Sequence, residues 1–322
     1  MTSSCDTACA LVLTRNRKRL LGDCVASLLG QTRPLQEIVV VDNASDDGTE
    51  AHLRERGLLG DPRVRLVRSE VNAGGAGGFA RALAEGLRGD ADWLWLMDDD
   101  ADPRPDALER LLESPPARDP GVAVLAGSVR TPAGELELLH RGHVGRFMRA
   151  LDAGAYVPGS HPALGFASFV GFLVRRDAAA RTGLPRAEFF IGCDDVDYSL
   201  RVRAHGTIRL VPESEIVHRL GMGGGAPTRR SAFWNRALGL GYTSASWEGY
   251  WKNLLAIRNF LWIKRHGQGV GALAFAGLAA TYAVKAVLYD PRPLRRLPWI
   301  ARAARAAWQG RFDTLPGPDA WR

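Results

Sequence analysis

Residues 92–103 read DWLWLMDDDADP, an apolar run that ends in three consecutive aspartates. The run predicts a buried strand, and the adjacent carboxylates at its end repel one another. A cap for the helix expected in PRPDALERLLE would use one carboxylate, not three. A divalent cation would turn this repulsion into attraction, and oxygen ligands suit Mn²⁺ or Mg²⁺. Period-two alternation would place Asp98 and Asp100 on one side of the strand and Asp99 on the other.

The residues before this stretch alternate between predicted strands and predicted helices. Apolar runs at residues 9–14, 37–42 and 63–68 are typical of buried strands, and helical spacing follows each of them. Such an alternation predicts an α/β fold in which helices flank a mostly parallel sheet. In these sheets, ligands bind beyond the carboxyl ends of the strands. Polar residues predicted at this edge are Thr14, Asp42, Asn43 and the three aspartates.

The middle of the chain is less regular. GVAVLAGSV (121–129) predicts a strand, and HRGHVGRF (140–147) predicts a loop. ASFVGFLVRRDAAARTG (167–183) predicts a strand followed by a helix. TIRLVPESEIVH (207–218) has the pattern of a last pair of strands.

A second group of acids lies in CDDVDYSLRVRAHG, at the start of a predicted amphipathic helix. Asp197 is spaced to pair with Arg201 one turn later. Asp194 and Asp195 follow the apolar EFFIG, and burial beside another negative charge raises a carboxyl pKa toward the range of a general base. We therefore expect one of these two acids to face a pocket as a base. His218 ends the last predicted strand, where a lone histidine is more often structural.

Composition limits the class of protein. The chain has 322 residues, is 46% hydrophobic, and carries a net charge of +7, which favours an anionic partner. The first residues carry no cationic leader, and we do not interpret them as a signal peptide. No motif supports nucleic-acid binding. Four cysteines fit no zinc-binding spacing, which indicates reduced thiols in a cytoplasmic protein; they are Cys5, Cys9, Cys24 and Cys193.

The glycine-rich NAGGAGGFARAL offers a competing interpretation. Residues 75–80 match the G-x-G-x-x-A fingerprint of nicotinamide dinucleotide binding, and Asp98 follows at about the usual spacing. That fingerprint requires a tight turn between strand and helix, whereas a loop over residues 69–73 precedes these glycines. An oxidoreductase therefore stays the less favoured alternative. The glycines would serve equally where the backbone approaches a substrate closely.

Taken in order, five motifs resemble those of family 2 inverting glycosyltransferases with the nucleotide-sugar GT-A fold. The resemblance covers roughly residues 9–220, and within the family it is strongest to bacterial galactofuranosyltransferases, followed by rhamnosyltransferases. It implies a GT-A α/β domain that binds a nucleotide sugar, with a helical C-terminal region. The motifs are LTRNR, EIVVVDNASDDGT, NAGGAGGF, WLWLMDDD and FFIGCDDVDYSLRVRAHG.

The resemblance implies a role for individual residues. Asp42 matches the acid that contacts the uracil base, and Thr14 would line the same pocket. Asp98 and Asp100 match a metal-binding pair, and His218 matches a histidine that completes the metal shell. Asp195 matches the catalytic base. The donor pocket is expected to include Thr14, Arg15, Asp42, Asn43, Asn72, Gly74, Gly75, Asp98 and Asp99, with Arg15 standing where an aromatic residue is common.

The implied reaction is a single inverting displacement. Asp195 would take the proton of an acceptor hydroxyl, and Mn²⁺ or Mg²⁺ would neutralise the leaving diphosphate. The best match is transfer of galactofuranose from UDP-galactofuranose to a glycan or lipid-linked glycan, as in cell wall polysaccharide biosynthesis. The alternatives are a dTDP-rhamnose-dependent rhamnosyltransferase, a glycoside hydrolase and a non-catalytic module that binds sugar nucleotides.

The C-terminal part has a different composition, so we expect one domain over residues 1–225 and a helical one over 226–322. Gly269–Tyr289 approaches the length of a membrane span, although Lys285 interrupts it. It is interpreted as a core helix or as a helix at the membrane interface, with a true membrane span as the less favoured alternative. Interspersed tryptophans and arginines suit an anionic headgroup layer. These features predict a peripheral protein on the inner face of the cell membrane. YWKNLLAIRN loosely matches an acceptor-binding segment of relatives, through Tyr250, Trp251 or Arg258.

Overall fold

A computed structural model describes residues 6–220, 233, 247, 249–290, 292–313 and 315. The chain divides into two compact units. The sheet unit contains Met1–Ala187 and Asp195–Gly221, and the helical unit contains Glu188–Asp194 and Met222–Arg322. The predicted domain boundary after residue 225 lies outside the described residues. The short segment that leads into Asp195 belongs to the helical unit.

Nine strands form the main sheet: β1 (Ala8–Thr14), β2 (Glu37–Asp42), β3 (Val64–Arg68), β4 (Trp93–Asp98), β5 (Ala101–Pro103), β6 (Val122–Arg130), β9 (Ala163–Leu164), β11 (Phe172–Arg175) and β12 (Thr207–His218). Their order is β3-β2-β1-β4-β11-β6-β12-β5, with β9 beside β12. The first four strands in this order are parallel, as are β6 and β12, whereas β11 is antiparallel to both neighbours. The sheet is therefore mixed, and the predicted α/β fold is confirmed.

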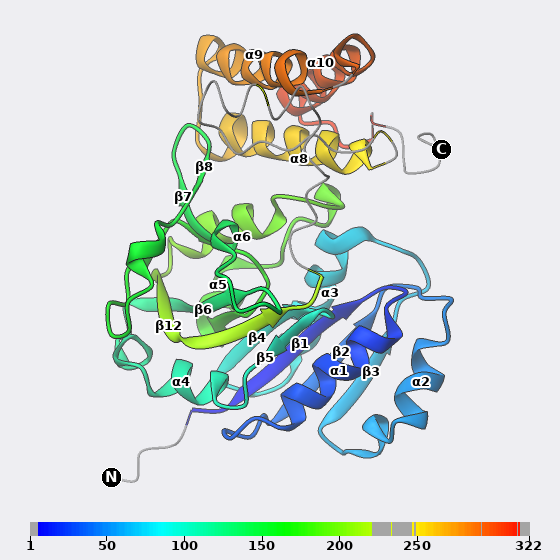
Figure 1. Ribbon diagram of the computed structural model, residues 1–322, viewed down its shortest axis with the longest axis vertical. Coiled ribbons are helices and arrows are strands. Elements are labelled where there is room, and N and C mark those ends of the chain that lie inside the picture. The colour runs from blue at the N-terminus through cyan, green and yellow to red at the C-terminus, as the bar shows by residue number, and fades with distance from the viewer. Residues whose placement is uncertain are drawn as a thin grey trace. The chain divides into compact units, whose positions relative to one another are not determined.

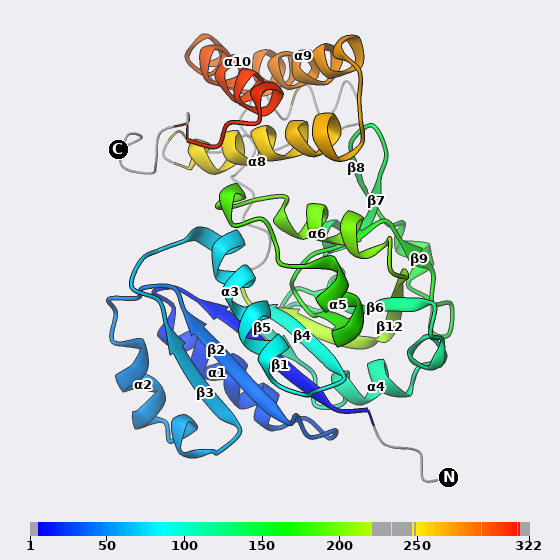
Figure 2. The same cartoon turned by 180° about the vertical axis from the view of Figure 1, so that it is seen from behind.

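Helices cover both faces of this sheet. Along β4, Trp93, Trp95 and Met97 point to one face, while Leu94 and Leu96 point to the other. Figure 1 shows the first helical layer in front of the sheet, and Figure 2 shows the second layer from behind. The first layer holds α1 (Lys18–Leu29), α2 (Thr49–Glu55) and α4 (Ala107–Glu113); the second holds α3 (Gly74–Arg88), α5 (Arg176–Thr182) and α6 (Asp194–Val202).

Glycines set the position of α3 against the sheet. A Cβ at Gly78 would lie 2.3 Å from Leu13, and a Cβ at Gly86 would lie 2.8 Å from Leu11. Only a residue without a side chain therefore allows α3 to approach β1 this closely. The contact fixes the start of α3, at Gly74, next to the carboxyl end of the sheet.

Two sequence-based predictions of strands and loops in this unit are wrong. The predicted loop at 140–147 forms most of a hairpin, in which β7 (Arg141–Val144) pairs with β8 (Met148–Ala150). Strand β7 also pairs with β10 (Phe166–Ala167), which is distant in the chain. Because this pairing is not local, no local sequence pattern indicates that β7 is a strand. The predicted last pair of strands is the single strand β12. Pro212 lacks an N–H and lies where the register against β6 shifts, so the chain makes an irregularity there and not a turn.

Besides the segment Glu188–Asp194, the described part of the helical unit contains α8 (Tyr250–Trp262), a π-helical turn (Ile263–Gly267), α9 (Ala272–Tyr289) and α10 (Pro293–Gln309). A buried ion pair, Arg296 Nη1 to Asp290 Oδ1 at 2.9 Å, links the start of α10 to the end of α9. Of the helices described, α9 alone has the length and apolar composition of a membrane span, and only 22% of it is buried. Leu273 on its exposed side is 92% exposed.

Short 3₁₀ turns occur between these elements; they are η1 (Leu58–Gly60), η2 (Pro115–Arg118), η3 (Leu138–His140), η4 (Ala153–Ala155) and η5 (Ala187–Phe189).

Candidate active site

The three aspartates lie where the parallel strands end. Strand β4 ends at Asp98, which is level with Leu13 of β1, while Thr14 is level with Asp42 of β2. The predicted alternation of the aspartates is wrong, because the strand stops and Asp99 and Asp100 form the following turn. Their carboxylates therefore do not point to opposite faces of a strand.

Two side chains from β1 and the loop after it hold this turn. Thr14 Oγ1 donates to Asp99 Oδ2 at 2.7 Å. Arg17 Nη1 lies 3.1 Å from Asp99 Oδ1 and 3.1 Å from Asp100 Oδ2. Asp99 is thus fully engaged by the protein and serves as an anchor. Arg17 was not among the predicted site residues, although it is the last residue of the motif LTRNR.

Asp100 faces His218 at the end of β12. Its Oδ1 is buried, accepts no hydrogen bond within the described residues, and lies 3.5 Å from His218 Nε2. The other ring nitrogen, Nδ1, lies 2.7 Å from Glu137 Oε2. A histidine held by a carboxylate at one nitrogen and exposing the other toward an oxygen ligand has the arrangement of a metal ligand. An unsatisfied buried carboxylate oxygen beside it fits a divalent cation.

The electrostatics of this cluster are those of crowded carboxylates. Burial and the neighbouring acids raise the pKa of Asp98 to about 7. Burial raises the pKa of Asp99 to about 6, although Arg17 and Thr14 oppose the shift. Burial disfavours a charged His218, but Asp100 and Glu137 outweigh it and raise its pKa to about 9. The acids around His218 therefore favour a positive charge beside Asp100 and Glu137.

Glu137 and His140 were not among the predicted site residues. With His218 they form a group whose ligand atoms all lie within 4.8 Å of one another, so this group could also hold a metal ion. His140 Nδ1 lies 2.8 Å from Ser168 Oγ, and burial beside Arg141 lowers the pKa of His140 to about 3. The histidine is therefore neutral. The sequence signal for this pair is the Glu-x-x-His spacing, which ends at the first residue of the predicted loop.

The predicted donor-pocket residues form a hydrogen-bonded network after β2. Asn43 Nδ2 lies 3.1 Å from Asn72 Oδ1 and 3.0 Å from the carbonyl oxygen of Gly74. Arg15 Nη1 donates to the carbonyl oxygen of Asn43 at 2.9 Å. Asp42 is buried, and its Oδ1 accepts from the Ser45 N–H at 2.9 Å.

This network joins the end of β2 to the glycine-rich start of α3, where Gly75 is half-buried in the first turn. The structure thus brings the predicted donor-pocket residues to one edge of the sheet.

Asp195 is the second residue of α6. It is half-buried, its Oδ1 accepts from the Val196 N–H at 2.7 Å, and burial raises its pKa to about 6. The predicted pair of Asp197 and Arg201 is present at 2.8 Å, which leaves Asp197 a structural role.

A buried guanidinium lies near Asp195. Arg141 is fully buried and donates to the carbonyl oxygens of Gly127 and Val170 at 2.9 and 2.7 Å. Its charge adds to the lowering of the His140 pKa by burial and opposes the rise in the Asp195 pKa that burial causes. Arg141 thus contributes positive charge to the surroundings of both groups.

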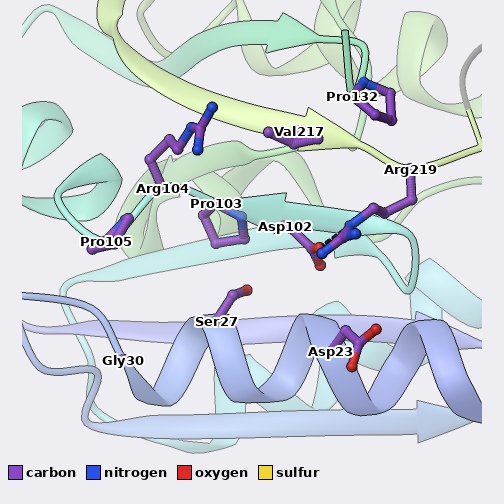
Figure 3. Close-up of a pocket in the computed structure, with 10 residues that line it drawn as sticks. All are labelled: Asp23, Ser27, Gly30, Asp102, Pro103, Arg104, Pro105, Pro132, Val217 and Arg219. Atoms are coloured by element: carbon purple, nitrogen blue, oxygen red, sulfur yellow. Dashed lines mark hydrogen bonds and ion pairs between the residues drawn. The ribbon is translucent and has the colours of Figure 1, made fainter. Parts of the chain in front are cut away.

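A separate hollow of about 420 Å³ lies between α1, β5 and β12 (Figure 3). The ion pair of Asp102 with Arg219 borders it, together with Asp23 and Ser27 of α1. None of the residues predicted to bind the donor or a metal lines it. We therefore do not assign it to the donor.

Comparison with known proteins identifies the family. Residues 9–182 match glycosyl transferase family 2. The chain belongs to this family. It is 31% identical over 212 residues to the galactofuranosyltransferase GlfT1 of Mycolicibacterium smegmatis, covering 62% of this chain and 67% of that relative. It is 33% identical over 202 residues to GlfT1 of Mycobacterium tuberculosis, covering 61% of this chain and 64% of that relative.

Solved structures of low identity share the fold of this family 2 chain. GalNAc-T7 with UDP, GalNAc and Mn²⁺ matches with a TM-score of 0.55 and 15% identity, over 79% of this chain and 51% of that one. The mannosyltransferase PcManGT from Pyrobaculum calidifontis, in complex with GDP-Man and Mn²⁺, matches with a TM-score of 0.52 and 19% identity, over 95% and 86%. The fold is GT-A-like, and the protein is a glycosyltransferase. The oxidoreductase and hydrolase alternatives are set aside.

Proposed function

We propose that this glycosyltransferase moves galactofuranose from UDP-galactofuranose to a hydroxyl of a glycan or lipid-linked glycan, with inversion and with the help of Mn²⁺ or Mg²⁺. The observation that best supports the proposal is the buried pair of Asp100 and His218. The two residues lie next to each other at the strand ends of a family 2 chain. The galactofuranosyltransferase relatives support the donor sugar. A dTDP-rhamnose donor is the second candidate, because it rests on the same motifs.

Asp98, Asp100 and His218 would hold the cation in this proposal. When bound, it would supply positive charge to the diphosphate leaving group. Arg17 contacts both Asp99 and Asp100 and adds a second positive charge to this edge of the sheet. Asp99 keeps the turn in place. The donor would lie along Thr14, Arg15, Asp42, Asn43, Asn72, Gly74, Gly75, Asp98 and Asp99.

Asp195 would act on the acceptor. Its carboxylate takes the proton of the acceptor hydroxyl while that oxygen bonds to the anomeric carbon. The bond from this carbon to the diphosphate breaks on the opposite face, so the configuration inverts. Burial supports this role, because it raises the pKa of Asp195 to about 6 and makes the carboxylate a stronger base.

A panel of UDP- and dTDP-sugars, screened with Mn²⁺ for donor hydrolysis and for transfer, tests the proposed donor. We expect UDP-galactofuranose to be turned over and dTDP-rhamnose to be inert. If dTDP-rhamnose alone is turned over, it is the donor in place of UDP-galactofuranose. An absence of turnover with every sugar would contradict the proposal. The Asp195→Asn variant, run in parallel, excludes a contaminating activity.

The pH dependence of transfer should report Asp195. A base must be deprotonated to act, so kcat/KM should be constant above about pH 6 and fall as the pH drops through that value, with the raised pKa of Asp195 as the cause. The measurement is the pH profile at saturating Mn²⁺. A flat profile between pH 5 and 8 would remove Asp195 from the base role.

Glu137 should orient His218 and not bind the cation itself. Loss of such a partner typically weakens metal binding about 10–100-fold. We therefore expect Glu137→Ala to lower the Mn²⁺ affinity by that factor in an EPR titration. His140→Gln is the matched control and should change little. Equal losses in both variants would place the ion within the group of Glu137, His140 and His218.

We propose that the protein is cytoplasmic and binds the inner face of the membrane through its helical unit, where lipid-linked acceptors would be met. The exposed side of α9 carries Leu273, Val284 and Val287, and α10 exposes Arg302 and Arg305. Apolar contact combined with arginines suits an anionic interface, at about 1 kcal/mol per basic residue near the headgroups.

Co-sedimentation with vesicles tests this membrane proposal. We expect binding to anionic vesicles at low salt, weaker binding to neutral ones, and release of the electrostatic part by salt. Leu273→Glu combined with Val284→Glu should abolish binding. Val157→Glu, at another exposed apolar residue, should leave it unchanged. A wild-type protein that stays in the supernatant with both vesicle types contradicts the proposal.

A further inference from the structure

The segment Glu188–Asp194 leads directly into Asp195, and its backbone is strained. Phe190, Gly192 and Cys193 have φ values of 62°, 85° and 62°. This left-handed region is unfavourable for residues other than glycine. Strained backbone of this kind persists only where the surroundings hold it, and it is concentrated at functional sites.

Asn259 of α8 makes hydrogen bonds that stabilise this strained segment. Its Nδ2 lies 3.0 Å from the carbonyl oxygen of Phe189, 3.1 Å from that of Ile191 and 2.8 Å from that of Gly192. The side chain is completely buried. Three carbonyl oxygens that converge in a buried place repel one another unless a donor lies between them. The amide of Asn259 is that donor.

Arg258 determines which way this amide points. Its Nε and Nη2 lie 2.9 and 2.8 Å from Asn259 Oδ1, so Oδ1 is engaged and Nδ2 must face the segment. Arg258 also donates from Nη2 to the Phe189 carbonyl at 3.0 Å and from Nη1 to the Phe312 carbonyl at 2.9 Å.

Arg258 is only 1% exposed, so the sequence-based suggestion that it contacts the acceptor is wrong. A buried guanidinium bound to carbonyl and amide oxygens alone is costly to desolvate. In the described part of the chain it has no carboxylate partner. Packing by itself does not require a charge at this position, which points to a function for the arrangement.

We infer that Arg258 and Asn259 are positioning residues of the transfer reaction. They hold residues 189–193 in the strained conformation from which α6 starts, and so they determine where the carboxylate of Asp195 stands. The inference rests on the proposed role of Asp195 as base. Neither side chain touches substrate, and both act through the backbone.

Steady-state kinetics with the donor identified by the panel, together with calorimetry of UDP in the presence of Mn²⁺, tests the inference. Asn259→Ala should lower kcat by up to about 100-fold, because small misplacement of a catalytic group costs about that much. Its UDP affinity should stay at the wild-type value. In the Asp195→Asn background the same change should have little further effect, since the two residues act in series.

Asn253→Ala on the same helix is the control and should keep its kcat, because Asn253 makes no hydrogen bond with the described residues. An unchanged kcat in Asn259→Ala, parallel losses of kcat and UDP affinity, or full additivity with Asp195→Asn would overturn the inference. If circular dichroism shows that Asn259→Ala does not fold, Arg258→Lys is measured in the same way. That variant keeps the positive charge but lacks the two guanidinium nitrogens that bond Asn259 Oδ1. The single variant Asp195→Asn tests the assignment of Asp195 as the base. A failure of that assignment can therefore be distinguished from a failure of the inference about Arg258 and Asn259.

Discussion

Replacing Asp195 by asparagine should lower kcat about 10²–10⁴-fold, the usual loss when a positioned general base is removed. The substitution keeps the shape of the side chain and its acceptor for the Val196 N–H, which lies 2.7 Å from Oδ1. It removes only the ability to take a proton. Because the base acts on the acceptor, the affinity for UDP with Mn²⁺ should stay nearly unchanged, and the loss should be in kcat.

Asp194→Asn is the matched control for this experiment. Asp194 is the preceding carboxylate and is buried, whereas Asp195 is half-buried. We expect Asp194→Asn to keep much more of its kcat than Asp195→Asn. If the order of the two variants is reversed, Asp194 is the base.

Removal of the divalent cation should greatly slow turnover and remove most of the affinity for UDP. Asp98, Asp99 and Asp100 are consecutive, and burial with mutual repulsion already raises the pKa of Asp98 to about 7. A diphosphate brought to this edge would meet three carboxylates whose negative charge Arg17 and His218 compensate only in part. Charge stabilisation by a metal is typically worth several kcal/mol, so a rate loss of at least about 100-fold is expected.

Calorimetry of UDP with EDTA, and then with added Mn²⁺, measures this effect directly. Affinity should be lost with EDTA and restored by Mn²⁺ in the wild-type protein, but not in Asp100→Ala. Asp102→Asn should behave as wild type, because Asp102 pairs with Arg219 outside the proposed cation ligands. Equal UDP affinity with and without the cation would disprove the metal assignment.

The parts of this site that could be predicted are those encoded by local pattern. Thr14, Asp42 and Asp98 end continuous apolar strands, and parallel pairing brings Thr14 level with Asp42 and Asp98 level with Leu13, one residue earlier. Their shared edge therefore followed from periodicity and the topology of parallel sheets. The family motifs added expected roles for Asp195 and His218.

The parts that were missed depend on contacts between distant segments. Glu137 contacts His218 from 81 positions away in the sequence, and no local pattern indicates that contact. The antiparallel position of β11 between β4 and β6 likewise depends on tertiary contacts and not on local sequence. Arg258 has the appearance of a surface residue in the sequence, and only the folded helix shows that it points inward.

The close approach of α3 to β1 has a consequence for engineering this enzyme. Any side chain at Gly78 or Gly86 would push the helix away from the strand and would move the loop that ends at Gly74 with it. Natural or designed changes in donor preference are therefore expected in the side chains that this loop presents, such as Asn72 or the exposed Val71. A mutant library aimed at new sugar donors should vary these loop positions and keep both helix glycines invariant.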